Sequence, residues 1–505
     1  MKKIFSYILA TVAASGLFVS CSLELEPTSS IVIKEGNPVI YTFQDLEEFE
    51  SRILSRFRGL YGSSLKCIED VMLDEFNASA GFGNNYGSVH RTDASFTSSD
   101  SYVESYWSSY YYAIKDYNFL IDALTDKNNI PAGTEGAAAV VQGEAYMFRA
   151  DAYMQLVRHF GKDYDPADTK ALGVPLVLHY DLYARPARNT VHEVYKQIKE
   201  DLDSAAVRLA GEAGQVASIY PTIDAVNFLY ARYFLDVEDY DNAIVYADKV
   251  IDTGKYALAK TADDMKAEYD DDSGTEPIMQ MYGSKSELPG AISIYTSMGG
   301  DDKYGVVSNA LFFPTKKLVD AYDAADLRKA QWFATTKFWT MVNGNYYRGD
   351  FVTFVKYYGN PALQSGKIYN AVQMTKPFKI GEMYLIKAEA QAQNGNIPGA
   401  KAALKVIQSA RGATLTGGTL DDVQLEWFRE TPGEGLRLSC LKRWHVGFAA
   451  REGQAGALLK NVLMTGESYT GRTWAADDYH FVWPIPASEI RLNENLEQNE
   501  PYGRQ

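Results

Sequence analysis

The chain has 505 residues, and 46% of them are hydrophobic, which is enough to bury a substantial core in one large or several smaller domains. Its formal net charge is −16, and this acidic balance argues against a nucleic-acid partner, because proteins that bind nucleic acid carry a basic surface. The charge is compatible with a soluble domain in an external or periplasmic compartment.

The amino terminus predicts export and lipid anchoring. Lys2 and Lys3 precede a short apolar run, which is the pattern of a secretory signal and is too short to span a membrane in the mature protein. The run ends in a small residue followed by Cys21, as in bacterial lipoproteins whose cysteine is acylated after cleavage; a plain signal peptide with an incidental cysteine is the alternative. We therefore expect a signal peptide over residues 1–20, a polar tether over 21–36, and a lipid anchor on Cys21.

Apolar residues at three- and four-residue spacing predict helices in the first half of the chain. At the first of them, Thr42 can cap the helix and Asp45 lies in its first turn, where the helix dipole favours an acid. In the helix expected at 144–161, small and apolar side chains form one stripe, so this helix must pack against a partner. The helices are expected over residues 42–61, 107–124, 144–161, 191–209 and 222–251.

An internal repeat links two distant parts of the chain. When the two segments are aligned so that Ala231 matches Ala388, Ala243 matches Ala400. Each segment then has the pattern of a helix, a short turn and a second helix. Small residues at these positions are typical of tetratricopeptide hairpins, in which two helices touch closely. The helix at 144–161 resembles the first helix of a third unit. Because the units are not contiguous, a simple solenoid is excluded.

Two stretches differ from this helical pattern. Residues 76–101 are rich in glycine, asparagine and serine, and residues 261–376 alternate short strand-like runs with turns and are dense in aromatic residues. We therefore predict an all-α fold, in which tetratricopeptide-like helical hairpins form a scaffold and a loop-rich insertion carries short strands. A single domain is expected over 37–505, with its scaffold over about 37–75, 102–260 and 377–505.

The sequence contains no recognisable catalytic or metal-binding motif. It has no G-x-S-x-G, Walker or H-E-x-x-H motif, and its six histidines lack metal-ligand spacing. The acidic run at 270–274 is similar to a calcium loop but lacks the third acid before the glycine, so a solvated acidic turn is expected. Cys67 and Cys440 are expected to be buried thiols. We predict no catalytic residue, no metal and no cofactor, and keep a hydrolase with two unrecognised carboxylates as an alternative.

Aromatic residues are the feature that indicates a ligand. The chain holds 36 Tyr and 7 Trp, and the C–H faces of sugars stack on aromatic rings while polar side chains meet the hydroxyls. Tyrosines inside the expected helices are assigned to core packing, and packing is also the alternative for aromatic residues in the loops. The candidate ligand-binding residues are Asp74, Tyr86, Arg91 and Trp107 around the first loop-rich stretch and Tyr295, Tyr304 and Trp332 in the second.

Ordered motifs run along nearly the whole chain. They lie at 107–118, 144–161, 174–175, 188–205, 239–243, 382–390 and 434–444. The most specific is the tail, which reads Trp-Pro-Ile-Pro at 483–486 and ends in Pro501-Tyr502. Together these motifs resemble the SusD/RagB family of outer-membrane nutrient-binding lipoproteins of Bacteroidetes. One departure is Cys440, which stands where that family commonly has Asp before Leu-Lys-Arg-Trp.

The resemblance implies a non-catalytic, all-α protein with a tetratricopeptide-based fold and loop insertions. Such proteins are anchored in the outer membrane, face the cell surface, and form lids on a SusC-like TonB-dependent transporter, capturing oligosaccharides or, in one branch, peptides. The resemblance therefore implies a surface lipoprotein that binds a glycan and delivers it to its transporter; peptide binding and glycan hydrolysis are the alternatives. Ligand residues vary within the family, so none of the candidate residues carries over by motif.

Overall fold

The computed structural model describes residues 40, 42–62, 65–295, 298–301, 305–342, 345–364, 371–456 and 462–503. The expected signal peptide, the tether, Cys21 and Tyr304 lie outside these residues. Within the part that is described, no helix combines the length and the apolar character needed to cross a bilayer.

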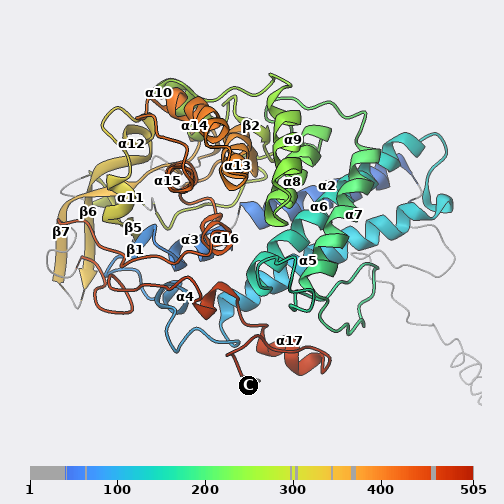
Figure 1. Cartoon of the computed structure of the whole chain (residues 1–505), viewed down its shortest axis with the longest axis horizontal. Helices are drawn as coiled ribbons and strands as arrows, with labels where there is room; N and C mark the ends of the chain where they lie inside the picture. Colours follow the sequence, from blue (N-terminus) through green and yellow to red (C-terminus); the bar gives the residue numbers. More distant parts are fainter. Residues whose placement is uncertain are drawn as a thin grey trace, which may run out of the picture.

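Helices dominate the molecule, and the strands are few and mostly short (Figure 1). The helices are α2 (Phe43–Tyr61), α3 (Leu65–Met72), α4 (Gly87–Arg91), α5 (Ser101–Thr125), α6 (Glu135–Phe160), α7 (Val191–Arg208), α8 (Ile223–Asp236), α9 (Tyr240–Ile251), α10 (Ala262–Tyr269), α11 (Lys316–Asp320), α12 (Leu327–Trp332), α13 (Ile380–Gln393), α14 (Ile397–Arg411), α15 (Leu420–Glu430), α16 (Arg437–Arg443) and α17 (Ala487–Leu492). The strands are β1 (Phe76–Ala78), β2 (Pro277–Met279), β3 (Met298–Asp301), β4 (Gly305–Ser308), β5 (Phe312–Pro314), β6 (Phe333–Val342), β7 (Asn345–Phe354) and β8 (Phe378–Lys379).

The long helices form one array in which each packs on the next. α5 packs on α6, α6 on α7, α7 on α8 and α8 on α9; α13 then packs on both α9 and α14. In Figure 1 the array runs from α5 and α7 on the right to α13 and α14 near the top. The chain therefore leaves the array after α9, builds the loop-rich part, and rejoins the array at α13. The predicted fold class and the helical hairpins are confirmed.

Local sequence explains where several of these helices begin. The Thr42 hydroxyl accepts a hydrogen bond from the Asp45 amide, and the Asp45 carboxylate accepts one from the Thr42 amide. Thr190 and Glu193 form the same reciprocal capping box at the start of α7. Each box satisfies amides that have no partner inside the helix.

Small residues allow the repeated hairpins to pack closely. Ala231 and Ala388 are fully buried at equivalent places in α8 and α13, and Ala243 and Ala400 are fully buried in the second helices. An ion pair then joins the two units, because Arg232 of α8 donates to the Glu382 carboxylate of α13, 2.5 Å away. Repeats that are distant in sequence are therefore neighbours in space.

Helix α6 lies inside the array rather than at its surface. We expected a single apolar stripe, but every residue from Met147 to Phe160 is buried, so this half of the helix is enclosed on all sides, whereas residues 135, 136 and 139 near its start are exposed. Its polar side chains have internal partners. Arg149 pairs with Asp201 at 2.6 Å, Arg158 with Asp236 at 2.8 Å, and His159 with Glu69 at 3.0 Å.

The loop-rich part is built from three small sheets. β3, β4, β6 and β7 form a four-stranded sheet in that order, with β4 and β6 parallel and the other pairs antiparallel. β1 pairs with β5 and β2 with β8. The β1–β5 pairing joins the two loop-rich stretches, which are far apart in sequence.

The acidic run at 270–274 is anchored in the core, so the expectation of a solvated turn is wrong for Asp272. Its carboxylate accepts hydrogen bonds from Lys376 Nζ at 2.6 Å and from Asn360 Nδ2 at 2.8 Å. The chain folds back over this turn and supplies these distant donors. The expectation for the thiols is confirmed, because Cys67 and Cys440 are both free and buried.

Candidate functional site

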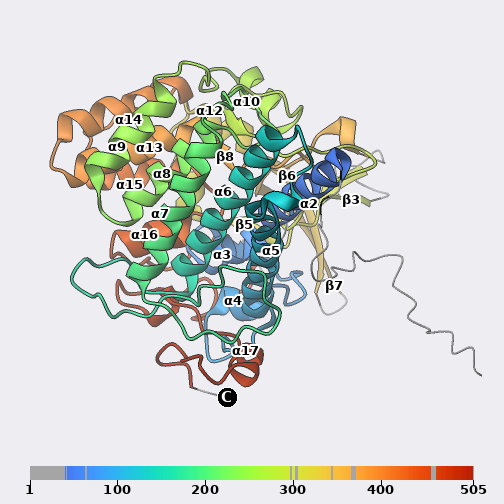
Figure 2. The same ribbon diagram turned by 90° about the vertical axis from the view of Figure 1, so that its right-hand side faces the viewer.

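A groove of about 730 Å³ is lined by α5, by the crossing that joins α6 to α7, and by α17. Figure 2 shows α17 below α5. Its floor comes from Trp107, Tyr111 and Ile114. These residues are spaced by four and three, so they lie on one face of α5. The volume is within the range of about 300–1,000 Å³ that is common for small-molecule sites.

The crossing between α6 and α7 forms one wall of the groove, and hydrogen bonds to its backbone hold it in place. Tyr111 Oη donates to the Pro175 carbonyl at 2.8 Å, and Asn118 Nδ2 donates to the Val177 carbonyl at 2.7 Å. At the far end, Asn493 Nδ2 donates to the Pro186 carbonyl at 2.8 Å. Because side chains from α5 and from the region after α17 hold the crossing at both ends, the groove is formed before a ligand arrives.

Exposed aromatic rings stand at the rim of the groove. The side chain of Tyr183 is 89% exposed and that of Tyr112 is 47% exposed, an unusual degree of exposure for rings of this size. The Tyr112 ring already contacts two cations, because the Lys115 ammonium lies 3.7 Å and the Arg56 guanidinium carbon 4.3 Å from its centroid. The Tyr183 ring, which remains in water, presents a flat apolar face to a ligand.

Polar side chains are also present in the groove. Asp181, Arg185 and Glu489 line the groove beside the aromatic residues. Partial burial, with the nearby charge of Glu104, raises the pKa of Glu489. The groove can therefore stack on the C–H face of a sugar ring and offer both donors and acceptors to its hydroxyls.

One of the predicted ligand-binding residues, Trp107, lines this groove. Its ring is 3% exposed and packs edge-on against Phe160, with 4.8 Å between the ring centroids. Trp107 therefore forms part of the floor, while Tyr183 offers the accessible ring.

Three further predicted aromatic residues are enclosed by protein, which corrects the expectation that they lie open in loops. Tyr295 is 0% exposed and stacks on Phe76 at 4.3 Å. Trp332 is 2% exposed and lies under the Lys356 ammonium. Tyr86 is also buried and its ring stacks on another tyrosine. A sugar ring has no access to these faces, because neighbouring side chains already cover them.

Asp74 is likewise part of the interior. Its carboxylate pairs with Arg437 at 2.9 Å and with Lys317 at 2.7 Å. Burial alone would raise the pKa of Asp74, but these two cations outweigh burial and hold the pKa well below its usual range. The carboxylate thus has a structural role in the fold.

Arg91 lies at the surface, outside the residues that line the groove. Its guanidinium donates to Asp93 at 3.0 Å, to Asn84 at 2.9 Å and to the Tyr469 hydroxyl at 3.3 Å. These contacts fix its orientation in a polar surface cluster. Tyr304 is outside the described residues.

Sequence reasoning missed Tyr183 and assigned Tyr112, which lies in an expected helix, to core packing, whereas Tyr112 is 47% exposed. Tyr183 lies in the crossing between Pro175 and Pro186, which the sequence shows only as an irregular, proline-rich segment. The available signal was the run Tyr180–Tyr183, where large apolar residues stand in a segment without helical or strand periodicity. In the described residues, no group of three or more His, Cys, Asp or Glu side chains is arranged to hold a metal ion.

Comparison with known proteins identifies the family. Residues 62–235 match a family model described as "Starch-binding associating with outer membrane", of the SusD-like type, and residues 339–502 match the model of the SusD family, SusD_RagB. The chain belongs to the SusD/RagB family. This is a family of non-catalytic, outer-membrane-associated proteins that bind carbohydrate. No curated protein matches the chain.

Solved structures share the fold of this SusD/RagB protein over nearly its whole length. A SusD superfamily protein from Bacteroides vulgatus is 22% identical, with a TM-score of 0.73, and the match covers 92% of this chain and 100% of that one. A SusD-like carbohydrate binding protein from the same species is 18% identical, with a TM-score of 0.69 and coverages of 90% and 98%. Surface glycan-binding protein A from Bacteroides uniformis is 19% identical, with a TM-score of 0.68 and coverages of 91% and 99%.

Proposed function

We propose that the protein is a surface-exposed lipoprotein that binds an oligo- or polysaccharide in the α5 groove and delivers it to a SusC-like TonB-dependent transporter. The observation that carries the proposal is the combination, in one groove, of exposed tyrosine rings with polar side chains of both signs. Membership of a carbohydrate-binding family supports a glycan as the ligand. The transporter is the partner that this family membership suggests.

The proposal includes a lipid anchor on Cys21, which would hold the protein at the outer membrane. A Cys21→Ala variant is expected to lack the lipid and to leave the membrane fraction. Metabolic labelling with a radioactive or clickable palmitate, followed by fractionation of the cells, measures both properties. An unlabelled parent, or a variant that partitions with membranes as the parent does, contradicts the anchor.

Calorimetric titration of the purified protein with a panel of glycans tests the binding function. A cognate glycan is expected to bind with a Kd in the micromolar to millimolar range, roughly −8 to −4 kcal/mol, and to be recovered uncleaved. Tyr183→Ala is expected to weaken binding about ten-fold, which corresponds to about 1.4 kcal/mol, because it removes an accessible ring. Tyr112→Ala should weaken binding less, because the Tyr112 ring already contacts Lys115 and Arg56.

A matched control separates the groove from the rest of the surface. Tyr479 is also exposed but does not line the groove, so Tyr479→Ala should bind as the parent does. If all three variants bind like the parent, the groove is not the glycan site. Binding of peptides in place of every glycan indicates the peptide-binding branch of the family, and cleavage products indicate a hydrolase.

A further inference from the structure

A second groove, of about 290 Å³, opens beside α2 and shares no lining residue with the α5 groove. One side of it is a face of α2, from which residues 51, 54, 55 and 58 line the space. The other side is formed by residues 219–220, which precede α8, and by residues 281, 282 and 287, which follow β2. The volume lies just below the range of about 300–1,000 Å³ that drug-sized ligands occupy, so it suits about one or two sugar rings.

Two exposed tyrosines line this groove. Tyr220 is 45% exposed and Tyr282 is 49% exposed. The segments that carry them run side by side, because Ser218 and Met279 form a parallel bridge and the Gln280 amide donates to the Ser218 carbonyl at 2.9 Å. Each tyrosine follows this bridge within three residues on its own segment. Single exposed rings are common on protein surfaces, but here the chain brings two of them to one groove.

Hydrogen bonds hold both tyrosine segments in place. Arg58 of α2 donates to the Tyr282 carbonyl at 2.8 Å and to the Glu287 carboxylate at 2.5 Å, so it ties this segment to the helix. On the other segment, the Ser218 hydroxyl donates to the Tyr220 carbonyl at 2.8 Å. The backbone beneath each ring therefore has a fixed course.

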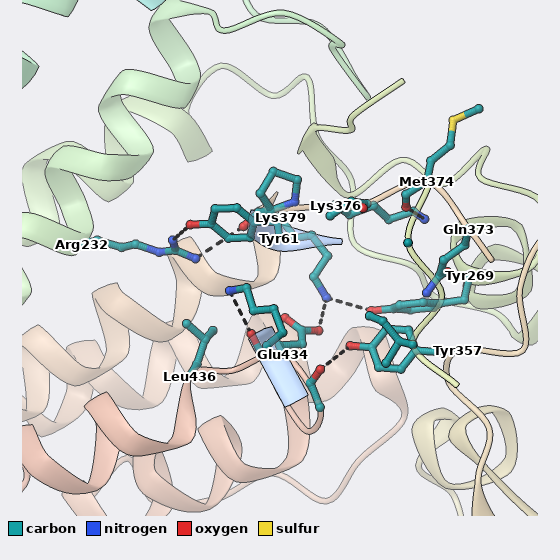
Figure 3. A pocket seen from close by; sticks show the side chains of 16 residues that line it. Tyr61, Arg232, Tyr269, Tyr357, Gln373, Met374, Lys376, Lys379, Glu434 and Leu436 are labelled. Atoms are coloured by element: carbon teal, nitrogen blue, oxygen red, sulfur yellow. Dashed lines mark hydrogen bonds and ion pairs between the residues drawn. The ribbon is translucent and has the colours of Figure 1, made fainter. Parts of the chain in front are cut away.

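The segment that carries Tyr282 is also held from behind. The Met281 amide donates to the Thr375 carbonyl at 2.8 Å. Figure 3 labels the two residues on either side of Thr375, and in this stretch Lys376 Nζ donates to the Met374 carbonyl at 2.9 Å. The walls of the groove are thus set by contacts within the protein, so a ligand does not have to order them.

The polar groups of the groove favour a neutral ligand. Arg58 and Glu287 are the charged side chains of the lining, and they pair with each other. The Glu287 side chain is half exposed and accepts from Arg58 through Oε1, which leaves its carboxylate able to accept from a ligand. Ser51 and Ser55 lie one turn apart on α2 and add two exposed hydroxyl groups.

Acids near the groove disfavour an anionic ligand. Desolvation, with the charge of Glu50 next in size, raises the pKa of Tyr220, and the charge of Glu47 acts in the same direction. The Tyr220 hydroxyl therefore stays protonated at neutral pH and can donate to a sugar oxygen. A uronate or a sulfated sugar would instead meet these carboxylates.

We propose that this groove is a second carbohydrate site, which binds about one or two rings of a neutral saccharide. Tyr220 and Tyr282 supply the faces on which the C–H side of a sugar stacks. Ser51, Ser55 and Glu287 meet the sugar hydroxyls. The site does not depend on the α5 groove, because the two grooves have no lining residue in common.

Saturation-transfer NMR on the Tyr183→Ala variant tests this site, because the loss of Tyr183 weakens binding in the α5 groove. The probes are maltotriose, cellotriose, xylotriose and mannotriose, each titrated to obtain a Kd. At least one is expected to bind saturably. Adding Tyr282→Ala or Tyr220→Ala to this variant is expected to weaken that binding about ten-fold. Absence of saturable binding for all four probes, or unchanged affinity in both double variants, overturns the proposal.

Matched variants separate stacking from damage to the fold. Tyr282→Phe keeps the ring and should keep the affinity, so a loss as large as that of Tyr282→Ala contradicts stacking. Tyr479→Ala removes an exposed ring that lines neither groove and should bind as its parent does. Because Tyr220 and Tyr282 are half exposed, their substitutions should leave the unfolding temperature unchanged.

Two further outcomes have distinct meanings. Binding of tri-alanine in place of every saccharide identifies a peptide site and overturns the proposal. Failure of the α5 groove as a glycan site appears elsewhere, as equal binding by the parent and the single Tyr183→Ala variant. In that case the loss on adding Tyr282→Ala still supports the second site.

Discussion

At the scale of the residue, the buried Asp74 carboxylate is the group whose loss we expect to be most destabilising. Asp74→Asn removes the charge that Arg437 faces at 2.9 Å, and the Arg437 guanidinium remains buried. Breaking a buried pair in this way is expected to lower the free energy of unfolding by about 3–5 kcal/mol. Urea unfolding of parent and variant measures the difference.

The effect of Asp74 should depend on pH with a defined sign. Its pKa in the folded protein lies below the value of about 3.9 in an unfolded chain. Between these two pKa values the unfolded state binds more protons than the folded state. The stabilisation that the Asp74 carboxylate provides is therefore complete above about pH 4 and is lost as the pH falls through the folded-state pKa. The difference in free energy of unfolding between the parent and Asp74→Asn should therefore become smaller in acid. Asp320→Asn, at an exposed ion pair, is the control and should change little.

At the scale of the element, close helix packing in the repeats should be sensitive to volume. Ala388 of α13 is fully buried, whereas Ala402 of α14 is exposed. Ala388→Leu is expected to lower the free energy of unfolding by about 1–3 kcal/mol, because the added atoms force the neighbouring helices apart. Ala402→Leu makes the same chemical change in a helix without that crowding. Similar unfolding midpoints for the two variants would show that the repeat interface is not tightly packed.

Elements were more predictable from the sequence than sites were. Helical period and a capping pair such as Thr42 and Asp45 act within a few residues, so they can be read locally. The burial of Tyr295 and Trp332 depends instead on chain segments that arrive from far away, and their irregular surroundings have no period to indicate a face. Tyr183 was missed for the same reason. Its exposure depends on how side chains from α5 and from the region after α17 hold the crossing, and these are distant in sequence.

At the scale of the whole molecule, the helical scaffold and the loop-rich part share one core. The same hydrophobic cluster contains Phe148 of α6, Phe354 of β7 and Tyr295 of the insertion. We propose that residues 37–505 form a single folding unit and expect one cooperative unfolding transition. Far-UV circular dichroism and tryptophan fluorescence should give coincident denaturation curves. Two separated transitions would show that the insertion unfolds on its own.

The enclosure of α6 has a consequence for detecting ligands. Because its residues from Met147 to Phe160 are buried on every side, its amide protons can exchange with solvent only when the whole domain opens. Any ligand that binds only the folded state lowers the population of that open state by the factor 1 + [L]/Kd. The exchange rate of the α6 amides therefore reports binding to the folded domain whether the ligand occupies the groove or another surface.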